Sequence, residues 1–225
     1  MNKFSLLTTA ATVALFAYAT GNIARAGIIT TGDTDTPNVD TFLEIGRAAD
    51  GTMTINTVGG PSVVSSSHGG GVGRDTGATG IVTIDGAGAA WETGGPGGTG
   101  ATVRIGGADY LAGARGTGVV NVQNGGALIV DSADLSSFRN SSIFIGERDG
   151  SDGTLNVTSG GKVFLTDTTN TATDGVGLTG GRGGKALALV DGPGSEISVV
   201  SGIAGALSFM WVGSQTVMLE PLMAN

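Results

Sequence analysis

Short runs in which apolar and polar residues alternate recur along the chain. In five of them two apolar residues flank a small or polar one, as Val120 and Val122 flank Asn121. The inner pairs are Met53/Ile55, Val82/Ile84, Val120/Val122, Leu155/Val157 and Leu187/Leu189, and the residues between them are Thr54, Thr83, Asn121, Asn156 and Ala188. A period of two predicts β-strands, because successive side chains of a strand point to opposite faces.

Each of these runs is followed by a glycine-rich turn and a second short apolar run. The second runs are led by Val63, Trp91, Leu128, Val163 and Ile197. A third run ends in an apolar residue followed by glycine, with copies expected at Ile45-Gly46, Val72-Gly73, Ile105-Gly106, Ile145-Gly146, Val176-Gly177 and Val212-Gly213. Glycine in these turns predicts tight corners between the strands.

Three short strands cannot bury their apolar side chains within one repeat, so the copies must stack and share a core. We therefore predict an all-β fold, a right-handed parallel β-helix (β-solenoid) with three short strands per repeat. The unequal spacing of the repeats is expected to come from surface loops at the corners. The alternative, a β-sandwich or barrel, would require hairpin turns and no shared three-strand register.

The repeat resembles a known family over residues 43–213. An Ile-Gly anchor is followed by Gly-x-h-x-h-x-x-Gly-Gly-x-h-x-h, where h is hydrophobic, as in Gly118 to Val130. This pattern is similar to the β-strand repeat of autotransporter passenger regions and of some PEP-CTERM exported proteins of Gram-negative bacteria. The resemblance implies a β-solenoid and export, but no catalytic residues. It also implies a C-terminal barrel or a Pro-Glu-Pro anchor, and neither is found, so we expect the membrane anchor to be absent from this chain.

The chain divides into four parts. Residues 1–26 are expected to be a signal peptide, with Lys3 before an apolar stretch from Leu6 to Ala19 and cleavage before Gly27. Residues 27–41 form a polar lead-in that could serve as an N-terminal cap, and residues 42–213 form a solenoid of about five repeats. Residues 214–225 are expected to be an irregular tail, as a truncation would leave. The uncharged run from Ile197 to Met218 leaves a membrane span as an alternative.

Composition and charge narrow the range of possible partners. Without the signal peptide the chain has 9 basic and 19 acidic residues and therefore a net charge of −10. An acidic chain argues against nucleic acid or anionic membrane as a partner. The sequence contains no cysteine, which excludes disulfides and thiolate metal sites. We expect a secreted or cell-surface protein that needs no cofactor.

Candidate chemistry is sparse. Carboxylates that could serve a carbohydrate-active enzyme are Asp149 and Asp152 beside Arg148, or Asp131 and Asp134 in another loop. Residues 70–75 match the start of a calcium-binding repeat, but no second copy follows, which favours an ordinary glycine corner. His68 stands alone, so it cannot complete a triad or a histidine metal site.

One surface feature suggests binding. The outward position of the third strand is expected to carry Glu44, Arg104, Phe144 and Trp211, which stacking would align along one face. Exposed aromatic rings there could stack on sugars or contact a protein, unless the spacer loops cover them. We predict a non-enzymatic structural or adhesive solenoid that meets a surface polysaccharide or a protein of a host or neighbouring cell. The alternative is a carbohydrate-active β-helix enzyme, a polysaccharide lyase or a glycosidase.

Overall fold

The fold consists of three β-sheets that wind around one shared interior. The computed structural model describes residues 27–38, 42–94, 101–108, 113–131, 141–167, 176–201, 207–211 and 217–219. No helix occurs in these residues. The predicted signal peptide, residues 1–26, lies outside them, as does the candidate carboxylate Asp134.

We call the sheets A, B and C. Sheet A contains, in spatial order, β1 (Ile28–Gly32), β3 (Gly51–Asn56), β6 (Thr79–Asp85), β9 (Thr117–Gln123), β12 (Asp152–Thr158), β15 (Lys185–Asp191) and β18 (Val217–Leu219). Sheet B contains β2 (Leu43–Ile45), β5 (Gly69–Val72), β8 (Thr102–Ile105), β11 (Ser142–Ile145), β14 (Val176–Gly180) and β17 (Leu207–Trp211). Sheet C contains β4 (Ser62–Ser66), β7 (Ala89–Gly94), β10 (Ala127–Asp131), β13 (Lys162–Asp167) and β16 (Glu196–Ser201).

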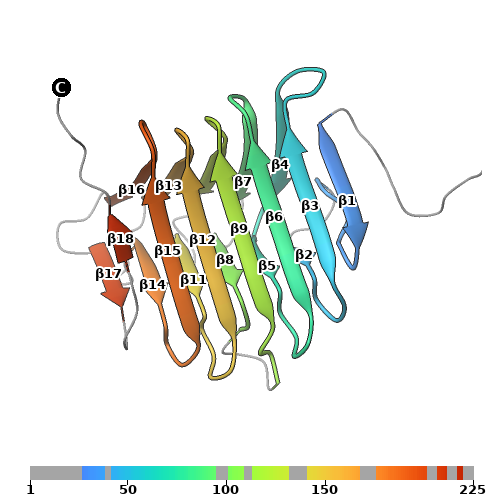
Figure 1. Ribbon diagram of the computed structural model, residues 1–225, viewed down its shortest axis with the longest axis vertical. Coiled ribbons are helices and arrows are strands. Elements are labelled where there is room, and N and C mark those ends of the chain that lie inside the picture. Colours follow the sequence, from blue (N-terminus) through green and yellow to red (C-terminus); the bar gives the residue numbers. More distant parts are fainter. Residues whose placement is uncertain are drawn as a thin grey trace, which may run out of the picture.

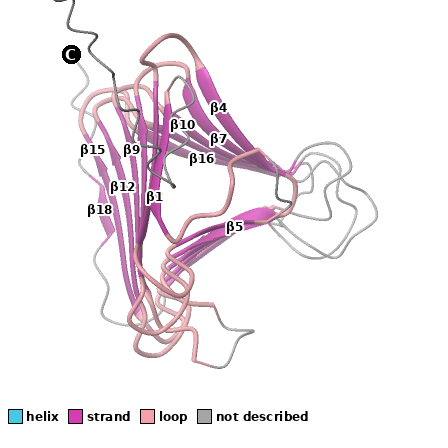
Figure 2. Ribbon diagram, turned by 90° about the vertical axis from the view of Figure 1, so that its right-hand side faces the viewer, coloured by secondary structure: helices cyan, strands magenta, loops and turns pink. Residues whose placement is uncertain are grey.

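The chain passes through sheets B, A and C in turn and then starts the next turn of the solenoid (Figure 1). Apart from β1, the paired strands are parallel. Figure 2 shows the three sheets as the sides of a roughly triangular stack. The predicted β-solenoid with three strands per repeat is confirmed.

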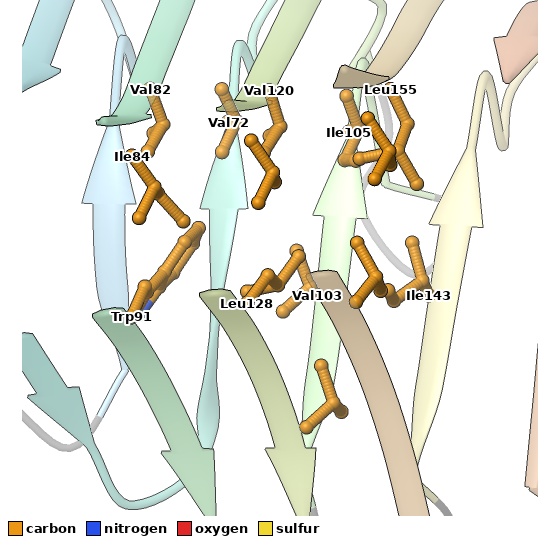
Figure 3. Close-up of a cluster of buried hydrophobic side chains, with 14 of the residues drawn as sticks. Val72, Val82, Ile84, Trp91, Val103, Ile105, Val120, Leu128, Ile143 and Leu155 are labelled. Carbon is orange, nitrogen blue, oxygen red and sulfur yellow. The ribbon is translucent and has the colours of Figure 1, made fainter. Parts of the chain in front are cut away.

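The core lies between the three sheets and is built from the inward half of each alternating strand. Val82, Val120 and Leu155 follow one another along sheet A, and each is fully buried (Figure 3). Ile105 on sheet B and Leu128 on sheet C complete the same interior. Each turn buries its apolar side chains only because the next turn covers them, as the repeat pattern predicted.

Trp91 packs against Gly70 of its own turn and Ser66 of the preceding turn. A Cβ atom on Gly70 would lie 2.5 Å from Cζ2 of Trp91, so only glycine leaves room for the indole ring. The indole Nε1 donates a hydrogen bond to Ser66 Oγ at 3.4 Å. The strand β5 has a weak sequence signal because its glycines accommodate the largest side chain of the core.

A glycine with positive φ joins sheet B to sheet A at each corner between these sheets that the structure describes. Gly73 follows β5 with φ of 67°, and a Cβ atom there would lie 1.7 Å from the carbonyl oxygen of Thr117 in the next turn. The equivalent glycines are Gly46, Gly106, Gly146 and Gly181. The corner therefore requires glycine both for its backbone conformation and for the close approach of the next turn.

Register corrects four details of the sequence prediction. Ile145 pairs with Gly180, and Gly180 pairs with Trp211, so the anchors are these residues and not Val176 and Val212. Ala188 pairs with the core residue Leu155, so Ala186 and Ala188 point inward while Leu187 is 37% exposed. Leu187 and Leu189 are therefore not an inner pair. In a strand that alternates alanine and leucine both faces are apolar, so pairing with β12 decides the orientation.

The other two corrections concern β4 and the C-terminal part. Val64, and not Val63, lies in the core of the first turn, where it pairs with Trp91. Residues 217–219 were expected in an irregular tail, but they form β18 and pair with β15. The described residues of the uncharged run from Ile197 to Met218 lie in strands. Among the residues described, no helix has the length and apolar character needed to cross a membrane.

The lead-in covers the N-terminal edges of all three sheets. Strand β1 pairs antiparallel with β3 of sheet A, and Thr34 forms an antiparallel bridge with Ile45 of sheet B. On sheet C, Asn38 accepts a hydrogen bond from the Ser65 backbone N–H and donates one to the Val63 carbonyl at 3.3 Å. Backbone groups that would template another strand are thereby paired.

Candidate contact surface

The predicted contact row lies on the outward side of sheet B, with one change. Pairing aligns Glu44, Gly71, Arg104, Phe144, Thr179 and Met210 in that order. Trp211 is aligned with Gly180 and Ile145 and therefore does not belong to this row. The sequence prediction placed it one residue out of register, because it took Val212 as the anchor of the last turn.

Glu44 is buried and not available for contact. Its side chain is 8% exposed and is paired with Arg74 and, at 3.4 Å, with Arg47. Burial raises the pKa of the Glu44 carboxyl above its ordinary value, and the positive charge of Arg74 opposes that shift. The two arginines come from the corners that follow β2 and β5, so corner residues fold back over the sheet.

Arg104 and Phe144 are also engaged. Glu147, whose side chain is 1% exposed, accepts a hydrogen bond from Arg104 Nε at 3.1 Å and one from Arg182 Nη1 at 3.2 Å. The guanidinium groups of the same two arginines lie 5.6 Å and 5.7 Å from the centre of the Phe144 ring. The ring is therefore within cation–π distance of two arginines.

The outward side of sheet B is thus a packed network of charges. Phe42 adds to the cover, since a Cβ atom on Gly71 would lie 3.5 Å from its ring. Each buried carboxylate is held by two arginines, which offsets the free energy of taking it out of water. Of the predicted contact residues, Glu44, Arg104 and Phe144 therefore hold the corners onto the sheet and do not form an open aromatic face.

The outward side of sheet A is different, and Figure 1 views it directly. Two outer rows run along it, which together we call the sheet A face. The first row contains Thr31, Thr52, Ile81, Val119, Thr154 and Leu187; the second contains Ile29, Thr54, Thr83, Asn121, Asn156 and Leu189. All are partly or fully exposed, and none is ionisable.

Side-chain hydrogen bonds order the sheet A face. Asn156 Nδ2 donates to Asn121 Oδ1 at 2.9 Å, and Asn121 Nδ2 donates to Thr83 Oγ1 at 3.4 Å. Across the cap, the Thr31 and Thr52 hydroxyl groups are 2.6 Å apart. The hydrogen bonds from Asn156 to Asn121 and from Asn121 to Thr83 form a ladder that fixes the side-chain conformations. The amide and hydroxyl groups of this ladder can each form more than one hydrogen bond, so they can also bond to a ligand.

Charged residues border the sheet A face on both long sides. Asp152 and Lys185 are paired in the register toward the sheet B corner, while Asp85 and Asp191 lie toward the sheet C corner. Asn124 Nδ2 donates to Asp85 Oδ1 at 2.7 Å and ties that corner. The face is therefore a long uncharged strip in an acidic chain.

The candidate carboxylates lie in two places. Arg148 and Asp149 belong to a tight turn closed by Ser151, whose backbone N–H donates to the Arg148 carbonyl, and Asp152 starts β12. Asp131 ends β10; burial and the charge of Asp167 raise the pKa of its carboxyl. The sequence did not predict an interaction between Asp131 and Asp167. It depends on the register of β10 and β13, which pairs Asp131 with Thr166, the residue before Asp167.

The remaining sites of candidate chemistry have structural roles. Residues 69–72 are β5, and Gly73 is the corner that follows it, as the glycine-corner interpretation of residues 70–75 predicted. His68 Nδ1 lies 2.9 Å from the hydroxyl of its neighbour Ser67. Within the described residues, no group of three or more His, Asp or Glu side chains could hold a metal ion.

Comparison of the chain with family models, curated proteins and solved structures found no match. Sequence analysis did not identify the sheet A face as a contact surface, although Thr54, Thr83, Asn121 and Asn156 stand between the inner apolar pairs. Their recurrence at one position of each repeat was a usable signal, since stacking must align them.

Proposed function

We propose that this chain is an exported structural or adhesive β-solenoid that acts through the sheet A face. The observation that carries the proposal is the contrast between this uncharged, hydrogen-bonded strip and the acidic composition of the whole chain. A rigid stack presents many weak contacts in fixed positions, and such contacts add when the partner is also repetitive. The role requires geometry and no catalytic group.

Export is supported by the sequence of residues 1–26 and by the resemblance of the repeat to autotransporter passengers. A cell-surface or secreted location follows from that proposal. Fractionation of native cells with an antibody to residues 105–165 tests it, with intact mass measured on the positive fraction. A species that begins at Gly27 in the medium or outer membrane is expected; an uncleaved species in the cytoplasm would overturn export.

Adhesion is tested with cells that display the chain. Binding of these cells to immobilised surface polymers and to neighbouring cells is measured for the unaltered chain and for Val119→Lys. Val119 lies in the centre of the sheet A face, and its side chain points away from the core. We expect the charge to lower adhesion, while unchanged adhesion would exclude this face as the contact surface.

A carbohydrate-active enzyme is the second candidate, and Asp131 is the observation that favours it. Burial and the charge of Asp167 raise the pKa of the Asp131 carboxyl, and a raised carboxyl pKa is one of the features that a general acid requires. Reducing-sugar or unsaturated-product release is measured on a polysaccharide panel, with Asp131→Asn as the matched variant. Product release that Asp131→Asn abolishes would replace the adhesive proposal with the enzymatic one.

A further inference from the structure

We propose that the sheet A face binds one extended strand of a neutral polysaccharide, laid along the solenoid axis and across the β-strands. This inference deepens the proposed function and rests on it, because it assigns a ligand class to the same face. It also reassigns the contact from the aromatic side chains of sheet B to the threonine and asparagine rows of sheet A.

The shape of the face favours a long, narrow ligand. Neighbouring strands lie about 4.8 Å apart, and residues two apart in a strand lie about 6.7 Å apart. The face spans β1, β3, β6, β9, β12 and β15, so its two rows cover a strip of about 25–30 Å by about 12 Å, or about 350 Å². A single polysaccharide strand has this shape, and a globular domain does not.

The same area argues against a second copy of the chain. Two such faces packed together would bury about 700 Å² in total, whereas a specific protein–protein interface buries at least about 1,200 Å². Enlarging the contact would bring Asp85 and Asp191 of one copy toward charged borders of the other. A stable dimer through this face is therefore not expected.

The chemistry of the face favours a neutral sugar polymer. Threonine and asparagine offer hydroxyl and amide groups, while Ile81, Val119 and Leu187 offer apolar surface in the same rows. A pyranose ring presents hydroxyl groups and C–H surface together, so both kinds of side chain have a counterpart. The strip offers no positive charge to an anionic polymer, and the acidic chain around it repels one.

The order of the face predicts how affinity depends on ligand length. The Thr83–Asn121–Asn156 ladder holds its side chains before binding, which lowers the conformational entropy lost on association. Each strand adds one small contact, so a ligand that spans two strands should bind with much lower affinity than a ligand that spans six. We expect at least about a tenfold gain in affinity from a two-sugar to a six-sugar ligand.

The experiment uses the purified chain and defined probes. Affinity electrophoresis is run in gels that contain neutral glucan, mannan, galactan or xylan, with carboxymethyl cellulose as the anionic counterpart of neutral hydroxyethyl cellulose. Calorimetry with oligosaccharides of two, four and six sugars follows on the polymer that retards the chain. Retardation by at least one neutral polymer, weaker retardation by the anionic one and a gain with length are expected. Retardation by no neutral polymer, or stronger retardation by the anionic one, overturns the inference.

Two variants locate the site. Val119→Lys places a charge in the centre of the sheet A face, and Ile129→Lys places the same charge on the outward side of sheet C in the following strand of the chain. Both positions are partly exposed, so both variants are expected to fold. Val119→Lys should weaken polymer binding by about tenfold or more, and Ile129→Lys should leave it within about twofold. Equal losses in the two variants would overturn the assignment to sheet A.

The outcomes separate this inference from the proposed function. If Val119→Lys lowers adhesion of cells but no neutral polymer binds the purified chain, the contact surface stands and the ligand class is wrong. If Val119→Lys changes neither adhesion nor polymer binding, the contact surface itself is wrong. Thermal melting and size-exclusion chromatography of both variants exclude unfolding or dimer dissociation as the cause of a loss.

Discussion

Sheets A and B share one core, but their outward surfaces differ in charge and in exposure to solvent. The outward row of sheet B is covered by charged residues from the corners, with Glu147 held between Arg104 and Arg182. The two rows of the sheet A face carry no charge, although charged residues border them, and they are ordered by hydrogen bonds between amide and hydroxyl groups. A stacked repeat can therefore cover one outer face with residues from its corners and leave another outer face exposed to solvent. The inward-facing side chains of the strands follow the same apolar pattern in both sheets.

The largest effect is expected from the core that both sheets share. Val120 is fully buried and its neighbour Val119 points outward from the same strand. Val120→Asp places an unpaired charge in the core and should destabilise the fold by more than about 4 kcal/mol, enough to unfold or aggregate it. Val119→Lys should change the melting temperature little. Far-UV circular dichroism and thermal melting measure both; equal behaviour of the two variants would refute the predicted inward and outward assignment.

The next largest effect concerns the corner that joins the two sheets. Gly73 and Gly77 both have positive φ, but a Cβ on Gly73 would lie 1.7 Å from the Thr117 carbonyl oxygen, whereas a Cβ on Gly77 would meet nothing within 4 Å. Gly73→Ala should cost about 3 kcal/mol or more, because the Thr117 backbone must move. Gly77→Ala should cost only about 1–2 kcal/mol, which is the conformational penalty alone. Chemical denaturation of both variants tests this difference, and a Gly77 effect as large as the Gly73 effect contradicts it.

A smaller effect is expected within the covered face of sheet B. Glu147→Gln removes the charge that holds Arg104 and Arg182, and it should cost about 2 kcal/mol because the carboxylate is buried while the arginines are partly exposed. Glu196→Gln is the control, since Glu196 and Lys162 form an exposed pair 2.9 Å apart, worth less than about 1 kcal/mol. Equal losses in urea denaturation would mean that the sheet B network is an ordinary surface feature.

The smallest effect is a pH dependence at the cap that borders both sheets. Backbone N–H groups of Ala48 and, less strongly, Ala49 lower the pKa of Asp33 below its ordinary value of 3.8. A lowered pKa in the folded state stabilises the cap above pH 3.8, and that stabilisation is lost as the pH falls from there through the folded pKa. The protection of the Ala48 and Ala49 amides from hydrogen exchange, measured relative to the intrinsic exchange rate at each pH, should therefore fall below that pH, and Asp33→Asn should remove the added acid sensitivity. Unchanged acid sensitivity in Asp33→Asn would contradict the role of its charge.

The sequence predicts most of the architecture because the fold repeats. The pairs Val82/Ile84, Val120/Val122 and Leu155/Val157 are inward as expected, and the glycine corners Gly46, Gly73, Gly106 and Gly146 lie where they were placed. The errors cluster where a repeat loses the alternation of apolar and polar residues. In β15 alanine and leucine alternate, and near Val176 several glycines could serve as the corner, so local pattern could not decide the register.

The contact surface was harder to predict for a different reason. Sequence analysis weighted aromatic and charged residues, and it identified Glu44, Arg104, Phe144 and Trp211. Whether such residues are exposed to solvent depends on the corner residues that fold over them. Glu147 is buried, but the sequence does not distinguish it from a solvated carboxylate. The rows of Thr and Asn became a candidate only when strand pairing aligned them and showed that no charge intervenes.

Single cysteines test the central contrast most directly, because the chain contains none of its own. Thr83 lies in an outer row of sheet A and is partly exposed, whereas Thr179 lies in the outward row of sheet B and is 7% exposed. On intact cells, Thr83→Cys should react quickly with a membrane-impermeant maleimide, and Thr179→Cys should react at least about tenfold more slowly until the chain is denatured. Equal rates, or a faster reaction at Thr179→Cys, would contradict an open sheet A face beside a covered sheet B face.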